Sequence, residues 1–299
     1  MEYKIVEITG GLGNQMFQYA FAKSLEYHLQ MPILLDKSWY EANKKQSIPF
    51  SLNLYNLDLK YANKEQIDYA KQKVRIFGKE IRIIRSILKR IQGSRIASPC
   101  RYDEYRQEYL QPNHFMYFSG YFQNPRYFKG ISSHIKKILC PLPIQSEVNK
   151  HKLQSILSSQ NSVFVHIRRG DYLSLSWQLD MSYYKKAVKL ILERVEKPDL
   201  FVFCTDKAFL QGLDLGYPFI DMTSENINPN NHFEDMTLMA HCKHGIVANS
   251  TYSWWSAYLI DNPHKIVIAP TPWVFDTDEI ICEDWIKIRA TRECQPNKP

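Results

Sequence analysis

The chain has 299 residues, of which 44% are hydrophobic and 13% aromatic, and its net charge is +7. This length accommodates two domains of ordinary size, and the hydrophobic content excludes general disorder. No apolar run approaches the roughly 18 residues that span a membrane, and the N-terminal segment does not resemble a signal peptide. The six cysteines include no CxxC pair, so we expect neither a disulfide framework nor a zinc site, and a reduced, cytoplasmic location.

Short apolar runs alternate with segments of helical periodicity, which predicts α/β structure with parallel sheets. In the first half we expect strands over 3–8, 32–36 and 115–122 and helices over 14–29 and 125–139. Residues 140–150 contain two prolines and are the best linker candidate.

After this linker candidate the alternation resumes. Strands are expected over 162–167, 200–206, 217–222, 245–250 and 265–269, and helices over 182–195, 232–243 and 251–260. The pattern predicts two Rossmann-like domains that face a cleft, over 1–145 and 146–299, with a C-terminal tail that can pack back on the first domain. In such sheets ligands bind beyond the carboxyl ends of the strands, so motifs at these ends carry the most weight.

Positive charge is concentrated over residues 71–106, which contain eleven Lys or Arg residues and three acidic ones. Over 74–91 a helical spacing would place isoleucines on one side and basic side chains on the other. Such a helix either buries its isoleucines in the domain or makes peripheral contact with an anionic membrane, at the inner face. The segment has few aromatic residues and no known RNA-binding sequence, so we expect no nucleic-acid partner.

The glycine-rich segment GGLGNQ, residues 10–15, follows the first predicted strand and opens a helix. Gly11 and Gly13 match the first two glycines of a dinucleotide fingerprint, and Asp36 stands where a ribose-binding acid would. The third glycine position holds Met16, whose side chain would prevent the close approach of helix and strand. We therefore expect no dinucleotide at this loop.

The same segment has a second interpretation. Its glycines form a backbone turn, and Asn14 and Gln15 follow at the N-terminus of the predicted helix. We expect both side chains to point into the cleft, where polar groups can meet a substrate. Gly11, Gly13, Asn14 and Gln15 are therefore candidate site residues.

The segment VFVHIRRGDY combines an apolar strand with a charged end. Adjacent Arg168 and Arg169 at the mouth of a parallel sheet are costly to place unless an anion or a carboxylate meets them. Guanidinium groups bind phosphate oxygens through a bidentate fork. Gly170 permits a tight turn, and Asp171 can orient an arginine in a pair that braces the strand end. Together with His166, the two arginines favour an anion-binding site.

A second candidate lies where the strand predicted over 245–250 runs into a helix. Asn249, Ser250 and Thr251 bring hydroxyls and exposed N–H groups to that helix start, which can cradle an anion or simply cap the helix. Asp235 lies early in the preceding helix. Its carboxylate either accepts from the N1–H and amino group of a guanine or serves as an acid favoured by the helix dipole.

Four segments together resemble the α-1,2-fucosyltransferases of glycosyltransferase family 11, above all the bacterial members that build H-type and Lewis-type antigens: GGLGNQMFQYAFAKSL, GYFQNPRYF, VFVHIRRGDY and ANSTYSWWSAYL. The resemblance extends to about residue 288. It implies a GT-B fold and inverting transfer of L-fucose from GDP-β-L-fucose (GDP-fucose) to the 2-hydroxyl of a terminal β-galactoside. Lactose, N-acetyllactosamine and a lipopolysaccharide O-chain are such acceptors. No metal and no cofactor is implied.

The resemblance also implies roles in donor binding. Arg169 would be the main diphosphate contact with Arg168 in support, and Ser250 and Thr251 would contact the same group. Asn249 belongs to the same donor-binding segment. The N-terminal loop that carries Asn14 and Gln15 would face donor and acceptor across the cleft.

His166 and Asp235 would contact guanosine. Asp171 is the carboxylate nearest in sequence to the arginines and is the candidate general base, although a salt bridge to them would lower its pKa and weaken it. Asp276 and Asp278 imitate a metal-binding DxD motif, but they follow the last predicted strand, and we expect solvated surface there. From the residues alone, a non-catalytic nucleotide- or glycan-binding module stays an alternative.

Overall fold

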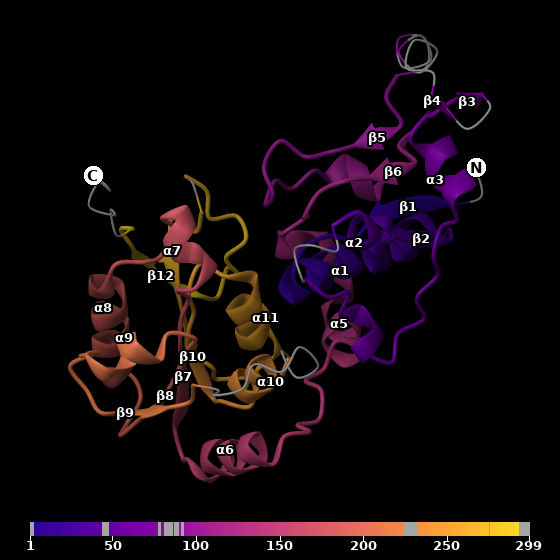
Figure 1. The fold of residues 1–299 in the computed structure, drawn as a ribbon. Coiled ribbons are helices and arrows are strands. Elements are labelled where there is room, and N and C mark those ends of the chain that lie inside the picture. The colour runs from indigo at the N-terminus through magenta and orange to yellow at the C-terminus, as the bar shows by residue number, and fades with distance from the viewer. Residues whose placement is uncertain are drawn as a thin grey trace. The chain divides into compact units, whose positions relative to one another are not determined.

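Figure 1 shows the computed structural model, which describes residues 3–43, 48–76, 79–80, 86, 90, 93–223, 233–274 and 276–292. The chain divides into two compact units, Met1–Leu139 and Cys140–Pro299, each built around its own parallel sheet. The predicted α/β class, with parallel sheets in two domains, is confirmed. None of the helices in these ranges has the length and apolar composition that a bilayer span needs.

The sheet of unit 1 has the order β2-β1-β6-β5, and its strands run parallel. These strands are β1 (Lys4–Glu7), β2 (Ile33–Asp36), β5 (Ile96–Ala97) and β6 (Tyr117–Phe118). The long helix α1 (Leu12–Leu29) follows β1 and buries Phe21, which stacks on Phe122 with ring centroids 4.0 Å apart. The shorter helices are α2 (Ser38–Ala42), α3 (Lys64–Ala70) and α5 (Ser132–Ile138), and the 3-10 helices are η2 (Leu52–Leu54), η3 (Gln107–Leu110) and η4 (Pro125–Ile131).

Two elements of unit 1 differ from expectation. The strand expected over 115–122 is limited to the two residues of β6, and the helix expected over 125–139 begins as η4 before it continues as α5. The side chain of Asn124 accepts from the backbone N–H of Arg126 at 3.0 Å, and a proline occupies the first helical turn. This local turn chemistry favours a tight turn at the start of the segment over a regular α-helix.

The amphipathic helix expected over 74–91 is wrong at its start. β3 (Arg75–Ile76) and β4 (Lys79–Glu80) pair antiparallel. Only two residues separate these strands in the sequence, and one of them is Gly78, a combination typical of a hairpin. Residues 86 and 90 are helical and exposed, and residues 77–78, 81–85, 87–89 and 91 lie outside the described residues.

The sheet of unit 2 has the order β12-β11-β10-β7-β8-β9 and is also parallel. Its strands are β7 (Ser162–Ile167), β8 (Asp199–Cys204), β9 (Phe219–Asp221), β10 (His244–Ile246), β11 (Val267–Thr271) and β12 (Ile286–Arg289). Figure 1 shows α8 (Met181–Leu192) and α9 (Lys207–Gln211) on one face of the sheet and α10 (Glu234–Ala240) and α11 (Thr251–Leu259) on the other. Every residue of β7 is buried, as expected for a central strand covered on both faces.

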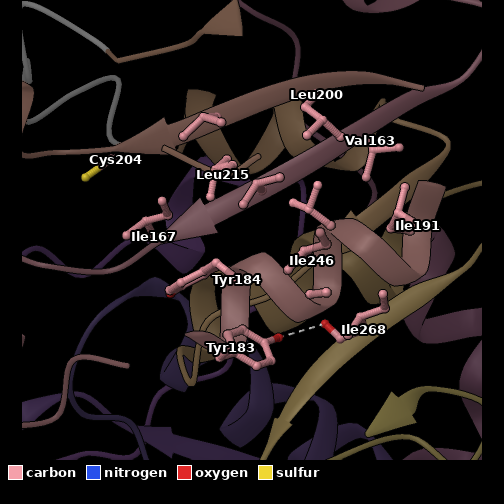
Figure 2. Packing of buried hydrophobic residues seen from close by; sticks show 14 of the residues in the cluster. Val163, Ile167, Tyr183, Tyr184, Ile191, Leu200, Cys204, Leu215, Ile246 and Ile268 are labelled. Carbon is pink, nitrogen blue, oxygen red and sulfur yellow. Dashed lines mark hydrogen bonds between the residues drawn. The ribbon is translucent and has the colours of Figure 1, made fainter. Parts of the chain in front are cut away.

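Helix α8 packs its apolar side onto this sheet, as Figure 2 shows. Tyr183, Tyr184 and Ile191 belong to one buried cluster with residues of the central strands. The hydroxyl of Tyr183 donates to the backbone oxygens of Val247 at 2.7 Å and Ile268 at 3.2 Å. A buried polar group therefore ties α8 to strand β11 and to the end of β10.

Unit 2 also contains elements that the sequence pattern did not indicate. Helix α6 (Glu147–Ser158) occupies the end of the linker candidate 140–150, the short helix α7 (Asp171–Leu175) follows β7, and β12 comes after the last expected strand. Helices as short as α7 and α9 span too few residues to show a hydrophobic period. Asp180 is the N-cap of α8 and accepts from the backbone N–H of Ser182 at 2.8 Å.

The segment before α6 is held to unit 2 by Glu234, which is buried at the start of α10. Its carboxylate accepts from the backbone N–H groups of Gln145 at 2.7 Å and Ser146 at 3.0 Å. Nδ2 of Asn149 in α6 donates to the same carboxylate at 2.5 Å. Three hydrogen bonds therefore compensate the burial of this acid.

Candidate active site

The carboxyl ends of three neighbouring strands of unit 2 bring the predicted donor-binding residues to one edge of the sheet. Ile167 of β7 pairs with Cys204 of β8, and Val165 of β7 pairs with Ile246 of β10. The segments that leave these strands therefore lie at the edge where ligands bind in open parallel sheets. They are 168–171 after β7, 205–206 after β8 and 247–251 after β10.

Arg169 is held by residues that follow β8. Its Nε donates to Oδ2 of Asp206 at 3.0 Å, and its guanidinium lies 3.9 Å from the ring centroid of Phe209. Asp206 also caps α9 by accepting from the backbone N–H of Phe209 at 3.0 Å. The hydrogen bond from the N–H of Phe209, together with the charge and hydrogen bond of Arg169, lowers the pKa of the Asp206 carboxyl, although burial alone would raise it. A charged Asp206 therefore orients Arg169; the side chain of Asp171, which was also expected to orient an arginine, lies outside the described part of the structure.

The turn after the arginines depends on Gly170. Its φ of +41° is a conformation that side chains with a Cβ rarely adopt, so the predicted tight turn is confirmed. Helix α7 begins directly afterwards, and the backbone N–H of Tyr172 donates to the oxygen of Arg169 at 2.8 Å. The guanidinium of Arg168 lies 5.3 Å from the ring centroid of Tyr172. Each arginine of the pair thus packs on an aromatic ring.

His166, within β7, is buried and uncharged. It is 7% exposed, and burial, followed by the charge of Arg168, lowers its pKa to about 3. Its ring centroid lies 6.2 Å from that of Tyr252, and its Nδ1 reaches no hydrogen-bond partner among the described residues. A neutral imidazole suits contact with an uncharged part of a ligand better than contact with a phosphate.

The segment after β10 is tied to the segment after β7 by two hydrogen bonds. The hydroxyl of Tyr172 donates to the backbone oxygen of Asn249 at 3.0 Å, and Nδ2 of Asn249 donates to the backbone oxygen of Trp177 at 3.0 Å. Asn249 itself is buried. These bonds join two loops that are separated by about 75 residues in the sequence.

Ser250 and Thr251 lie where α11 begins. Ser250 accepts from the backbone N–H of Tyr252 at 3.4 Å, so its predicted capping role is confirmed, and Thr251 is half-buried. The hydroxyl of Tyr252 in turn accepts from the backbone N–H of Met236 at 2.8 Å. Asp235 lies half-buried in that first turn of α10. The structure therefore brings the starts of α10 and α11 together.

In unit 1 the expectation that the side chain of Gln15 points into a cleft is wrong. Its side chain is fully buried, and its Nε2 donates to the backbone oxygens of Gly10 and Pro49, both at 2.9 Å. Its Oε1 accepts from the backbone N–H of Ser51 at 2.7 Å. A carboxamide that is used at both ends by backbone groups is structural, and this one joins the start of α1 to the loop before η2.

The other residues of this loop have different environments. Gly11 is the exposed N-cap of α1, and Gly13 is buried within its first turn. Asn14 is half-buried, and its Oδ1 accepts from Nε2 of Gln123 at 2.9 Å. Gly10 has a φ of +74°, and a Cβ there would lie 2.7 Å from Nδ2 of Asn14, so glycine is required at this turn.

Asp36 is fully engaged within unit 1. It accepts from the hydroxyl of Tyr117 at 2.7 Å, the backbone N–H of Ser38 at 2.9 Å and Nζ of Lys71 at 3.3 Å. Burial acts to raise the pKa of this acid, but these hydrogen bonds and the charge of Lys71 lower it. Because the carboxylate of Asp36 already has these three partners, we assign it no role in binding a ribose.

The DxD-like pair lies in a loop that a further strand follows. Asp276 is exposed, and Oδ2 of Asp278 accepts from Oγ1 of Thr271 at 3.2 Å and Nζ of Lys287 in β12 at 3.0 Å. The pair follows the last predicted strand, as expected, although the unpredicted strand β12 comes after it; the expected exposure holds for Asp276, whereas Asp278 is half-buried. Throughout the described ranges, no group of three or more His, Cys, Asp or Glu side chains lies close enough to hold a metal ion.

A groove of about 590 Å³ lies on unit 1. The second half of α1 and the start of α5 form it, and its lining includes Lys23, Tyr27 and His134. The residues that line it include none of the predicted site residues, so we do not place the reaction there.

Asp206 and Phe209 were not among the predicted site residues. Asp206 is the last residue of the strand predicted over 200–206, where an aspartate at the end of the apolar segment LFVFCTD was visible, and Phe209 follows it. Their importance depends on which strand lies next to β7, and the local pattern does not contain that information.

The model of glycosyl transferase family 11 matches residues 4–289. The chain is 30% identical over 302 residues to an alpha-1,2-colitosyltransferase of Escherichia coli, covering 96% of this chain and 99% of that protein. It is 24% identical over 200 residues to galactoside alpha-(1,2)-fucosyltransferase 2 of Rattus norvegicus, covering 60% of this chain and 55% of that protein.

Among solved structures, a variant of Arabidopsis thaliana FUT1 in complex with GDP superposes with a TM-score of 0.51 at 10% sequence identity. The match covers 91% of this chain and 72% of that chain. This likeness shows the fold, and the predicted GT-B fold is confirmed. Since the family model extends over nearly the whole sequence, the chain belongs to glycosyl transferase family 11.

Proposed function

We propose that this glycosyltransferase moves L-fucose from GDP-β-L-fucose to the 2-hydroxyl of a terminal β-galactoside, with inversion at the anomeric carbon. The observation that carries the proposal is the arginine pair after β7, in which Asp206 braces Arg169 at 3.0 Å. Membership of family 11 and the fucosyltransferase activity named for the rat relative support fucose as the transferred sugar.

The donor's diphosphate is assigned to the arginines. Arg169 makes the main contact with Arg168 in support, because fixed guanidinium groups bind phosphate oxygens in pairs. Ser250 and Thr251 lie at the start of a nine-residue helix, whose N–H groups and positive dipole end favour the same anion.

The guanosine is assigned to His166 and Asp235. The imidazole of His166 is neutral at pH 7, so it can exchange hydrogen bonds with an uncharged base or ribose. A carboxylate at Asp235 can accept from both N1–H and the exocyclic amino group of guanine. This division leaves the cationic side chains to the diphosphate, and the neutral ring and the carboxylate to the nucleoside.

In the reaction the galactose 2-hydroxyl forms a bond to the anomeric carbon while the bond to the β-phosphate oxygen breaks. Negative charge develops on the leaving diphosphate, where Arg169 and Arg168 stabilise it. An arginine already oriented by Asp206 needs little rearrangement when that charge develops, which favours the transition state. We extend the proposal to a reaction that needs neither a metal nor a cofactor, since these cations supply the compensating charge.

The proton of the acceptor hydroxyl needs a destination. Asp171 is the proposed general base, because it follows the arginines directly at the start of α7. If the transition state resembles an oxocarbenium ion, the hydroxyl keeps its proton until late, so a modest base suffices. Asn14 of the N-terminal loop stays a candidate for contact with substrate, whereas Gln15 supports that loop.

A second donor sugar is favoured by one comparison. The Escherichia coli relative that covers 96% of this chain is named for the transfer of colitose. Colitose is the 3-deoxy form of L-fucose, so both sugars present the same ring and the same methyl group. GDP-colitose is therefore the alternative donor for the same site.

The test is release of GDP from each donor in the presence of EDTA, with lactose or N-acetyllactosamine added or left out. Lactose-dependent release from GDP-fucose in EDTA is the expected result, and the product linkage is then read by NMR. Release from GDP-colitose alone would replace fucose by colitose. Absence of release with either donor and either acceptor, while GDP still binds, would contradict the proposed transfer.

We also propose a cytoplasmic enzyme that contacts an anionic membrane surface through the basic segment 74–91. The concentration of positive charge over 71–106 supports this membrane contact. Because β3 and β4 replace the start of the expected helix, the attraction would come from the basic charge and not from the apolar face of one long helix. Flotation with vesicles of acidic lipid at low salt is expected to show binding. Recovery of the protein only in the unbound fraction would contradict it.

A further inference from the structure

Two buried amide oxygens near the end of β10 lack a hydrogen-bond donor. Asn249 is 1% exposed and Gln178 is 4% exposed. Within the part of the chain that the structure describes, no donor reaches Oδ1 of Asn249 or Oε1 of Gln178. Buried amide oxygens are nearly always paired in folded proteins, so each of these atoms indicates a ligand or a bound water.

The orientation of Asn249 is fixed by the other end of its amide. Nδ2 donates to the backbone oxygen of Trp177 at 3.0 Å, and turning the amide over would place two oxygens against each other. Gln178 follows Trp177 directly, and Tyr172 donates to the backbone oxygen of Asn249 at 3.0 Å. The two amides therefore lie in one group of residues, 172–178 and Asn249, which the hydrogen bonds of Tyr172 and Asn249 hold together.

Both atoms accept hydrogen bonds, so their ligand must donate. Diphosphate oxygens at neutral pH only accept, whereas sugar hydroxyls donate. Val165 pairs with Ile246, and continuing that register by three residues leads from Arg168 to Asn249. Asn249 thus lies beside the proposed diphosphate site. Two sugars are bonded to the diphosphate, the transferred sugar and the ribose, and since guanosine is assigned to His166 and Asp235, the transferred sugar is the remaining source of hydroxyl donors.

We infer that Asn249 and Gln178 each accept a hydrogen bond from a hydroxyl group of the donor's sugar. This inference rests on the proposed function and makes the two residues determinants of sugar specificity. L-Fucose carries hydroxyls at C2, C3 and C4. A site that leaves a buried polar group unpaired when one hydroxyl is missing discriminates against that deoxy sugar.

The first measurement uses the unaltered chain and four donors: GDP-fucose and its 2-deoxy, 3-deoxy and 4-deoxy forms. We expect kcat/KM to fall at least tenfold for two of the three deoxy donors, because two oxygens lose their hydroxyls. Equal kcat/KM values for all four donors would overturn the inference and would leave bound waters as the partners of the two oxygens.

The second measurement assigns one hydroxyl to Gln178. The Gln178→Leu variant should lose about 10- to 100-fold in kcat/KM with GDP-fucose and almost nothing with the one deoxy donor that lacks its partner. Its Kd for GDP should stay within about twofold of wild type, since the nucleotide is held elsewhere. An equal loss with every donor, or a parallel loss of GDP affinity, would show a structural role instead.

Asn149→Leu is the matched control. Asn149 is a buried amide of the same unit, and it donates to Glu234 at 2.5 Å, outside the group formed by residues 172–178 and Asn249. Its loss should affect all four donors equally. Failure of the proposed function appears differently, as absence of transfer by the wild type. In that case the ratio of GDP-fucose to GDP affinity, measured calorimetrically for wild type and Gln178→Leu, still tests the inference, and an unchanged ratio would overturn it.

Discussion

Replacing Asp206 with asparagine tests whether Arg169 acts through a fixed orientation. Asparagine keeps an oxygen that can cap α9 through the N–H of Phe209, because Asn and Asp cap helices about equally well. It removes the negative charge that lies 3.0 Å from Nε of Arg169. The variant therefore loosens the arginine while it changes the helix little.

The expected magnitude follows from this one contact. A hydrogen bond to a charged group contributes about 1.5–3 kcal/mol. The side chains of Arg169 and Asp206 are 17% and 30% exposed, so solvent screening places the value near the lower end of that range. If the loss falls on the transition state, kcat decreases roughly 10- to 30-fold. KM for GDP-fucose should change less than about threefold, because the loosened arginine still attracts the ground-state diphosphate.

The assay is the initial rate of GDP release with saturating lactose, accompanied by a thermal unfolding curve. Asp180→Asn is the matched control, because Asp180 caps α8 through the N–H of Ser182 at 2.8 Å. We expect kcat to fall for Asp206→Asn alone, with both unfolding midpoints close to wild type. An unchanged kcat for Asp206→Asn, or an equal fall for Asp180→Asn, would refute the reasoning.

Three further predictions follow from contacts described above. Arg169→Ala should lower kcat about 10²- to 10³-fold in the same assay, and a value within a few-fold of wild type would contradict its role at the diphosphate. The pKa of His166 is lowered to about 3 in the folded protein from its ordinary value of 6.5, so as the pH falls the unfolded chain binds the proton first. The contribution of His166 to stability is therefore complete above pH 6.5 and declines as the pH falls towards 3. Between pH 7 and 5, the free energy of unfolding measured by urea titration should therefore fall by about 2 kcal/mol less for His166→Gln than for wild type. Burial also lowers the pKa of His244, but this residue is present in both proteins and cancels in the comparison. Equal losses in the two proteins would disprove the prediction. Gln15→Leu should lower the free energy of unfolding by about 2–4 kcal/mol, because the N–H of Ser51 and two carbonyls lose buried partners; a stability equal to wild type would show that the bonds are dispensable.

Local sequence patterns predicted the central strands because burial on both faces makes them continuous apolar runs. The segment SVFVHI became β7 with the predicted bounds, and the charged residues after it lie at a sheet edge, as expected. These patterns did not show which strands lie next to each other in the sheet. Asp206 lies 37 residues after Arg169, and only the pairing of β7 with β8 brings the two together.

The errors have the same origin on a smaller scale. Gln15 occupies a helix start, where a polar side chain commonly faces solvent, but its partners Pro49 and Ser51 come from a loop further along the chain. Over 74–91 the isoleucines fit a helical spacing, yet β-branched residues also favour strands, and the hairpin at 75–80 followed the second preference. Periodicity alone did not separate these outcomes.

The hydrogen bonds of Glu234 have a consequence for domain exchange between relatives. A crossover placed at residues 146 and 147 would take Gln145 and Ser146 from one parent and Glu234 from the other. The new segment would still have to deliver two backbone N–H groups to a carboxylate that is 1% exposed. A crossover at Leu139 and Cys140 keeps both partners from a single parent. Because Asp235 is the next residue of α10, a chimera joined at the later point would also disturb the helix turn proposed to bind the nucleotide, so we expect the choice of junction to change donor affinity as well as folding.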